Sequence, residues 1–490
     1  MIPSPHCLEP ENISKMQFCL PQRFSRCLYS FLAAMFVAGF ASAAEEPKRP
    51  NIIFIMADDL GYGDLGCYGQ SLIQTPNIDR LAKEGIRFTQ AYAGGPVCTP
   101  SRSVLMTGLH NGHTVARDNV PHYRTYLEDN DTTLAEVLAS AGYRCGGIGK
   151  WSLGDANSVG RATNQGFDTW LGYLNQDHTH YYYPGYLDDD EGRMELPGNM
   201  KSRHTYSHTV LTKRALQFIR ESHDRKQPFF LYAAYTLPHF SSPKEDADGL
   251  TVPSTAPYSD RDWEPKAKKY AAMIHMLDQD VGRITQLVDQ SEIGHETLII
   301  FTSDNGGHHS VAKRFNTNGP LRGYKRDLTE GGIRVPLIAR WPGQIPANKT
   351  SDQVIAFQDM LPTFAELAGA KTPANLDGIS VVNALIGDEL QSERKYLYWD
   401  FGHCRNRYHQ AVRWKDWKGI RSDVRLGVAG PTQLYDLRHD LGEEHDVAAD
   451  HPEVVHHIEQ IMNTAVTPSE KYPIGEVYKG HAIWQPETDN

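Results

Sequence analysis

Short, largely apolar runs alternate with amphipathic helical segments through most of the chain after residue 50. The first run, residues 51–56, is continuously apolar, which is typical of a strand buried on both faces of a parallel sheet. Further strands are expected at 143–148, 229–235, 298–301 and 335–341. Because helical segments separate these strands, the series predicts a layered α/β domain.

Capping residues mark where two of the expected helices begin. Thr75-Pro76 precedes one helix, and Thr133 with Glu136 forms the capping box of another. Further helices are expected at 207–221, 270–288, 360–367 and 452–464. The apolar stripe over 270–288 is the clearest of them.

The alternation weakens near Lys371, where a linker-like stretch with Pro373 and Gly378 begins. Short strands are expected at 396–399, 411–414 and 434–437, before the final helix. We therefore expect a large domain over residues 45–372 and a small C-terminal α+β domain over 373–490, with antiparallel strands and a helix.

The first 44 residues are typical of a signal peptide. Arg23 and Arg26 precede an apolar run at 28–40, and Ala41-Ser42-Ala43 supplies small residues for cleavage. Met16 is a candidate for the true start. The run is shorter than the roughly 20 residues of a spanning helix, so we expect an exported, periplasmic or extracellular protein without a stable membrane anchor.

Charge and cysteine content narrow the function further. With 60 acidic and 49 basic residues the net charge is -11, which argues against general nucleic-acid binding. Removal of the signal peptide leaves four cysteines in an oxidising compartment. They are Cys67, Cys98, Cys145 and Cys404. Two disulfides are possible, although the spacing indicates no small disulfide scaffold and one of the four is expected to have another use.

Polar residues follow the expected strands, where ligands of open α/β sheets bind. They are Asp58, Asp59, Lys150, His239, Asp304 and Asn305. Because the carboxyl ends of parallel strands meet at one edge, we expect these six side chains to share one crevice.

Three of these residues are carboxylates and one is an amide, which together favour a hard cation. Asp58 and Asp59 can both reach one ion only where their strand has ended, because neighbouring strand residues point to opposite faces. An all-oxygen donor set suits Ca²⁺, or less well Mg²⁺, rather than zinc. A helix cap or solvated turn is the alternative for the Asp-Asp pair alone.

The segment Cys98-Thr99-Pro100-Ser101-Arg102 lies before an expected helix at 103–109. Pro100 suits a helix start, which places Cys98 at the positive end of the helix beside Arg102. The alternative is a buried cysteine that acts only as a small apolar residue.

From about Arg49 to the C-terminus the sequence resembles the type I, formylglycine-dependent sulfatases of the alkaline-phosphatase-like superfamily, including bacterial arylsulfatase and N-acetylgalactosamine sulfatase-type enzymes. The motifs are Asp58-Asp59, Cys-x-Pro-x-Arg at 98–102, Gly149-Lys150-Trp151, Pro238-His239, Asp304-Asn305-Gly306, 321–325, 330–336, Trp341-Pro342-Gly343 and Leu434-Tyr435-Asp436-Leu437. The resemblance implies a large mixed, mostly parallel sheet between helices and a small C-terminal domain.

The resemblance also implies roles for the site residues. Cys98 would be oxidised by a formylglycine-generating maturase, and the hydrated aldehyde would attack sulfur. Asp58, Asp59, Cys98, Asp304 and Asn305 would surround the cation. Arg102 would hold the formylglycine, while Lys150 and Lys325 would neutralise the sulfate. His239, an imidazole expected to titrate near neutrality, would protonate the leaving alcohol.

One position departs from the family pattern. Many members carry His two residues after the motif lysine, and this chain has Ser152, which hydrogen-bonds but does not take up charge near neutral pH. We keep Ser152 among the catalytic candidates.

A loop rich in aromatic and amide side chains, residues 172–186, is a candidate lip for a sugar site. It contains Asn175, Gln176, His178, His180 and Tyr181-Tyr182-Tyr183. His178 and His180 are predicted substrate contacts, and His403 and Arg405 are candidates to reach the same cleft. The alternative is a packed tyrosine-rich surface loop.

These features predict a sulfatase that hydrolyses sulfate esters of a carbohydrate of the galactose or N-acetylgalactosamine type. A phosphonate or phosphate ester hydrolase of the same superfamily is one alternative. A sulfated-glycan-binding protein without turnover is another, because catalysis depends on maturation of Cys98 and the family histidine is replaced by Ser152.

Overall fold

The computed structural model describes residues 49–119, 123–124, 126–190, 192–405, 407–422 and 430–483, so the expected signal peptide lies outside them. Residues Arg49–Asn490 form one compact unit. Among the described residues, no helix combines the length and apolar character that crossing a bilayer requires.

A ten-stranded sheet forms the centre of this unit, with the order β11-β2-β10-β9-β1-β8-β4-β5-β6-β7. Its strands are β1 (Asn51–Ala57), β2 (Ile86–Tyr92), β4 (Arg144–Lys150), β5 (Thr169–Tyr173), β6 (Tyr186–Asp188), β7 (Arg193–Glu195), β8 (Phe229–Ala234), β9 (Thr297–Ser303), β10 (Arg334–Arg340) and β11 (Lys349–Ala356). The central strand β1 runs parallel to β8 and β9, whereas β10 is antiparallel to β9 and β2. The predicted mixed, mostly parallel sheet is confirmed.

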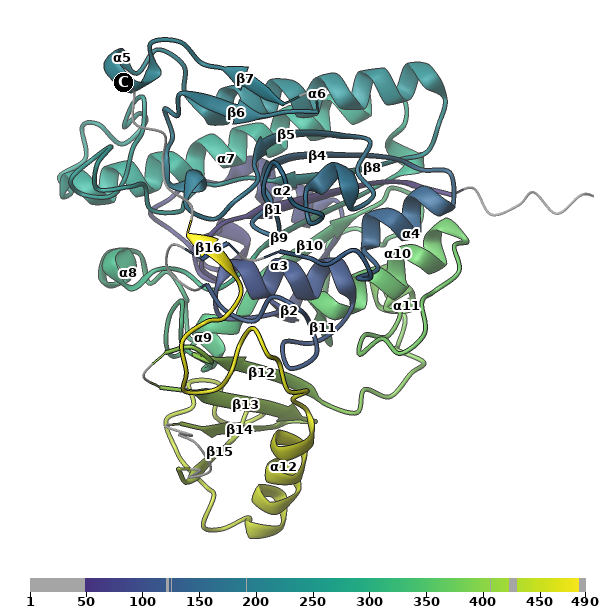
Figure 1. The fold of residues 1–490 in the computed structure, drawn as a ribbon, viewed down its shortest axis with the longest axis vertical. Coiled ribbons are helices and arrows are strands. Elements are labelled where there is room, and N and C mark those ends of the chain that lie inside the picture. The colour runs from purple at the N-terminus through teal and green to yellow at the C-terminus, as the bar shows by residue number, and fades with distance from the viewer. Residues whose placement is uncertain are drawn as a thin grey trace, which may run out of the picture. The chain divides into compact units, whose positions relative to one another are not determined.

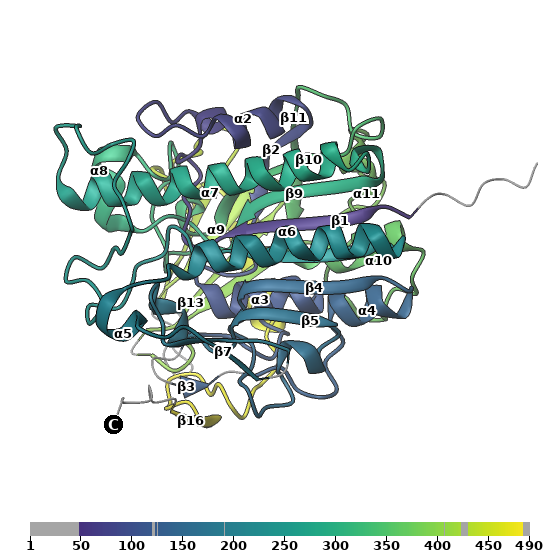
Figure 2. The same cartoon turned by 90° about the horizontal axis from the view of Figure 1, so that it is seen from above.

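Helices cover both faces of the sheet, as Figures 1 and 2 show. One face carries α2 (Pro76–Lys83), α6 (Ser207–Arg225) and α7 (Pro265–Gln290), and the other carries α3 (Cys98–Thr107), α4 (Leu134–Ser140) and α10 (Met360–Ala368). Ile53 and Ile55 of β1 belong to the first core, and Ile52 and Phe54 belong to the second. This double burial explains why β1 is apolar at every position after Asn51.

The C-terminal part contains a second, antiparallel sheet with the order β12-β13-β14-β15. Its strands are β12 (Leu397–Phe401), β13 (His409–Trp414), β14 (Trp417–Arg421) and β15 (Thr432–Asp436), and α12 (Pro452–Thr464) packs on one face. The sequence did not predict β14, because its Lys418 and Arg421 interrupt the apolar pattern. The predicted domain boundary after residue 372 stays a prediction.

The helix boundaries are mostly those expected. The capping box of Thr133 and Glu136 is present at α4. The prediction of a helix at 103–109 was wrong in its start, because α3 already begins at Cys98. Pro100 falls in the first turn of α3, where its missing N–H costs no helical hydrogen bond, so the helix extends further toward the N-terminus than we expected.

Shorter elements complete the chain. They are β3 (Tyr123–Arg124), β16 (His481–Ile483), α5 (Asn199–Ser202), α8 (His309–Phe315), α9 (Glu330–Ile333), α11 (Val382–Ile386), and the 3-10 helices Gly66–Tyr68, Ala162–Asn164, His178–His180, Gly294–Glu296 and Phe357–Asp359.

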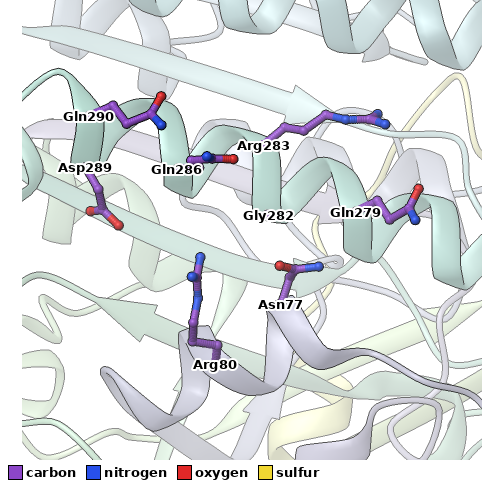
Figure 3. A pocket seen from close by; sticks show the side chains of 8 residues that line it. All are labelled: Asn77, Arg80, Gln279, Gly282, Arg283, Gln286, Asp289 and Gln290. Atoms are coloured by element: carbon purple, nitrogen blue, oxygen red, sulfur yellow. The ribbon is translucent and has the colours of Figure 1, made fainter.

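A polar groove of about 630 Å³ lies between α2 and α7, and Figure 3 shows its side chains. It is lined by Asn77, Arg80, Gln279, Gly282, Arg283, Gln286, Asp289 and Gln290. Gly282 permits the close approach of the two helices, since a Cβ there would lie 2.5 Å from Asn77 Oδ1. The groove contains none of the predicted site residues.

Buried charges join the C-terminal sheet to α9. Lys418 Nζ of β14 lies 2.9 Å from Glu330 and 3.5 Å from Glu443, and the Glu330 N–H donates to Glu443. Burial alone would raise the pKa of Glu330, but attraction to Lys418 and Arg334 lowers it to about 2. The C-terminal sheet therefore fixes the start of α9 and the segment before it.

The Lys418→Met substitution should lower the free energy of unfolding near neutral pH by about 3–5 kcal/mol, because it leaves buried carboxylates without their cation. The lowered pKa of Glu330 contributes stability that is present above its ordinary value of 4.5 and is lost as the pH falls toward 2. The difference in unfolding free energy between Lys418→Met and wild type should therefore shrink below pH 4.5. Denaturant unfolding near neutral pH and at a pH below 4.5 checks this.

Lys395→Met, at an exposed position before β12, is the matched control and should change stability little. Equal destabilisation by the two substitutions would contradict the proposed contribution of the buried charges.

Candidate active site

The predicted strand-end residues converge at one edge of the sheet. β1 ends at Ala57, directly before Asp58, and β4 ends at Lys150 itself. The Lys150 ammonium lies 2.6 Å from Asp58 Oδ2, and both side chains are fully buried. Gly149 allows the end of β4 to lie close to β8, because its φ is +90° and a Cβ would lie 1.9 Å from the carbonyl oxygen of Ala234.

The backbone turns sharply at the Asp-Asp pair. Asp59 has φ +63°, a left-handed conformation outside the strand. Its N–H donates to Asp304 Oδ1 at 3.2 Å, and Asn305 Nδ2 donates to Asp59 Oδ1 at 2.8 Å. Asn305 Oδ1 is buried and has no hydrogen-bond partner among the described residues. The turn therefore brings both aspartates and both β9-end residues to one place, as the sequence predicted.

Cys98 begins α3 and lies inside this cluster. Its Sγ is 3.3 Å from Asp58 Oδ1 and 3.6 Å from Lys325 Nζ, and the residue has no exposed surface. Burial raises the pKa of the thiol to about 12, with a further contribution from Asp58. An unmodified Cys98 would thus remain protonated near neutral pH and be a poor nucleophile.

Arg102, one turn further along α3, is completely buried. Its guanidinium donates to Asp304 Oδ2 at 2.7 Å and to the carbonyl oxygen of Lys150 at 2.7 Å. It also lies 3.5 Å from Asp58 and contacts the Tyr232 hydroxyl. Arg102 therefore ties α3 to the ends of three strands.

Lys325 and His239 form the opposite side of the cluster. Lys325 Nζ is 2.7 Å from the Asp59 carboxylate and 3.1 Å from His239 Nε2. His239 Nδ1 lies 2.7 Å from the carbonyl oxygen of Phe240, to which it donates. Nε2 is then free to accept from the Lys325 ammonium.

The surrounding charges shift several pKa values. Burial alone would raise the pKa of Asp58, but attraction to Lys150 and Arg102 lowers it well below its usual range. Burial and the Asp58 charge raise the pKa of Asp304 to about 6. Burial, together with Lys325, lowers the pKa of His239 well below its usual value. The expectation that His239 titrates near neutrality is therefore wrong for this arrangement.

Ser152, the departure from the family pattern, borders the cluster through other residues. It is buried, has φ +62°, and its Oγ donates to Gln176 Oε1 at 2.8 Å. The Thr99 hydroxyl also lies 3.5 Å from that Gln176 oxygen. Gln176 thus links Ser152 to the residue after Cys98.

The predicted sugar loop divides in the structure. The His180 ring lies 4.9 Å from the His239 ring and so reaches the site. His178 instead packs on Tyr173 and Tyr186, with Asp188 at 3.7 Å. Tyr182 and Tyr183 are buried, and the Tyr182 hydroxyl donates to the backbone oxygens of Thr236 and His239. The packed-loop alternative holds for those two tyrosines.

The small C-terminal sheet reaches the site indirectly. Arg405 pairs with Asp118 at 2.9 Å and also contacts the Asn119 backbone. Asn119 Oδ1 accepts the Thr99 N–H at 2.9 Å, beside Cys98. His403 is buried against Asp400 at 3.1 Å. Asn119 and Tyr232 were missed by the sequence analysis, because a lone loop Asn or strand Tyr carries no signal of its tertiary partner.

The four cysteines of the described chain do not pair. Cys67, Cys98, Cys145 and Cys404 are all free thiols. The two possible disulfides are therefore not formed.

Known protein families match both parts of this architecture. The Sulfatase family model matches residues 50–370, and the model for the N-sulphoglucosamine sulphohydrolase C-terminal region matches residues 323–468.

Individual proteins similar to this chain are also sulfatases. The N-acetylgalactosamine-6-sulfatase of Canis lupus familiaris is 33% identical over 391 residues, covering 76% of this chain and 72% of the relative. Arylsulfatase G of Rattus norvegicus is 32% identical over 485 residues, covering 87% and 88%. The crystal structure of Ps i-CgsB in complex with k-i-k-neocarrahexaose superposes with a TM-score of 0.74 at 31% identity, covering 85% of this chain and 92% of that one.

The family match spans the strand-end cluster, Cys98 and the lysines around it. The chain therefore belongs to the sulfatase family and is a sulfuric ester hydrolase.

Proposed function

We propose that this enzyme removes sulfate esters from a carbohydrate of the galactose or N-acetylgalactosamine type, using formylglycine at position 98 and a calcium ion. The observation that carries the proposal is the buried cluster in which Cys98 lies within 3.6 Å of both a carboxylate and Lys325. A formylglycine hydrate at this position would supply the nucleophile for sulfur.

The donor set supports a hard cation. Asp58 and Asp59, which cluster with Cys98 and His239, would hold it together with Asp304, the unpartnered Asn305 Oδ1 and the oxygen that replaces the Cys98 thiol. All of these donors are oxygens, which favours calcium over zinc. When bound, such an ion withdraws charge from sulfate oxygens.

The buried ammonium groups of Lys150 and Lys325 suit binding of the non-bridging sulfate oxygens. Lys150 has no exposed side-chain surface, and the Lys325 side chain is 8% exposed. Attraction to Asp58 raises the pKa of Lys150 despite its burial, so the ammonium stays charged. Arg102 stays engaged with Asp304, which suits holding residue 98 in place. In such a water-poor site these charges act strongly on the transition state.

His239 would give the proton to the departing alcohol. Its Nε2 accepts from the Lys325 ammonium at 3.1 Å, and Lys325 keeps its own proton because attraction to Asp59 raises the pKa of its ammonium despite burial. Binding of an anionic sulfate beside this pair raises the proton affinity of His239, which then acts as the acid.

Similar proteins support a sugar substrate. The relative from Canis lupus familiaris is named for N-acetylgalactosamine, and Ps i-CgsB was crystallised with an oligosaccharide. We further propose export of the enzyme and maturation of Cys98 by a formylglycine-generating enzyme. Paired assays on sulfate and on phosphate or phosphonate esters separate the proposal from the related hydrolase activity.

The Cys98→Ala substitution should lower kcat at least about 10⁴-fold on a sulfated galactose, because the precursor of the nucleophile is lost. Mass spectrometry of the wild-type peptide around position 98 should show an aldehyde in place of the thiol after co-expression with a maturase. Cys67→Ala, at a half-buried cysteine remote in sequence from the cluster, is the matched control and should keep activity.

A fully retained thiol in the co-expressed protein would favour the glycan-binding alternative without turnover. Activity that survives Cys98→Ala would contradict the proposed nucleophile.

Removal of divalent cations by a chelator should lower kcat about 100-fold or more, because the charge withdrawn from sulfate is worth several kcal/mol. Calcium should restore the activity at lower concentration than magnesium. Asp59→Asn should lower the affinity for calcium and so raise the calcium concentration that restores half of the activity. Full activity in the chelated enzyme would refute the requirement for a metal.

A further inference from the structure

Four aromatic side chains that adjoin or closely follow active-site residues in the sequence are connected by ring contacts. We call them the aromatic ledge: Phe240, His308, His309 and Tyr324. Phe240 follows His239, and Tyr324 precedes Lys325, so the ledge begins where the active-site side chains end.

Ring contacts run through the whole ledge. The Phe240 and His308 rings lie 4.4 Å apart, His308 and His309 lie 4.4 Å apart, and His309 and Tyr324 lie 6.5 Å apart. His309 begins α8, which lies at the left of both Figure 1 and Figure 2. The four rings therefore come from three separate segments of the chain.

Two rings support the ledge and two face solvent. Phe240 is partly buried. Its ring contacts the His308 ring, and Lys266 Nζ lies 4.7 Å from its centroid. His309 is exposed, and Tyr324 is 38% exposed although it is a large aromatic residue. Tyr324 and His309 are thus exposed rings in contact with neighbouring rings, and each offers apolar surface without the entropy cost of a flexible side chain.

The ledge is tied to the reacting groups through the backbone. The Phe240 carbonyl oxygen accepts from His239 Nδ1 at 2.7 Å, and the Lys325 N–H donates to Gly307 at 3.1 Å. The predicted sugar loop, residues 172–186, exposes less aromatic surface, since two of its three consecutive tyrosines are buried. Tyr324 directly precedes Lys325 and His309 lies two residues after Gly307, so both exposed rings are close in the chain to these backbone contacts.

We infer that the aromatic ledge is a saccharide-binding subsite, in which a sugar ring adjacent to the sulfated residue stacks on Tyr324 and contacts His309, whose ring is tilted 63° from that of Tyr324. This inference rests on the proposed function and extends it: the substrate is an oligosaccharide or longer chain rather than a monosaccharide. The apolar face of a sugar ring matches a flat aromatic surface of this kind.

The test compares a sulfated galactose monosaccharide with a sulfated galactan oligosaccharide. Tyr324→Ala and His309→Ala should each raise KM for the oligosaccharide about 5- to 10-fold, as expected for loss of one stacking contact, with a much smaller change for the monosaccharide. Tyr324→Phe keeps the ring and should retain the wild-type KM. His445→Ala, at a side chain that is 79% exposed in the C-terminal part, is the matched control.

Calorimetric binding of the oligosaccharide to Cys98→Ala protein, with and without the ledge substitutions, separates the two proposals. Weaker binding by the ledge variants supports the subsite even if the wild type hydrolyses neither sugar, an outcome that would refute only the proposed reaction. A KM ratio and a binding affinity that are both unchanged in Tyr324→Ala and His309→Ala would overturn the subsite.

Discussion

Mutual neutralisation of buried charges at the carboxyl edge of the large sheet determines the rest of this structure. Lys150 and Asp58 are both without exposed surface and lie 2.6 Å apart, and Arg102 and Asp304 repeat this arrangement at 2.7 Å. Each charge would be costly to bury alone, so each position requires its partner from another segment. The ends of β1, β4 and β9 and the start of α3 are thus held together by the same groups that would later bind an anion and a cation.

The second sheet supports this edge from the side of α9. Lys418 holds Glu330 at 2.9 Å, while Arg322 stacks on Tyr435 of β15 at 4.8 Å. These contacts flank the segment that carries Lys325. Asn119 and Arg405 provide a second connection, which ends at the N–H of Thr99. The described residues of the C-terminal part therefore contribute to the active site by holding its loops in place.

Much of the sheet and the site followed from local sequence. The continuous apolar run of β1 and the stripe of α7 identify themselves by periodicity, and the polar residues after the strands converge because parallel strands end at one edge. Other features depend on tertiary contacts. β14 contains Lys418, which is buried only because Glu330 comes from elsewhere. Likewise, burial and Lys325 lower the pKa of His239, and neither is visible in the motif Pro238-His239.

The complete enclosure of Cys98 has a consequence for the timing of biogenesis. A modifying enzyme would have to reach the Cys98 sulfur and bind the peptide around it. In the folded protein, however, Cys98 is the first residue of α3 and has no exposed surface. The proposed conversion of this side chain would therefore have to come before folding, while the segment is still extended. A polypeptide that folded first would keep the unconverted thiol enclosed.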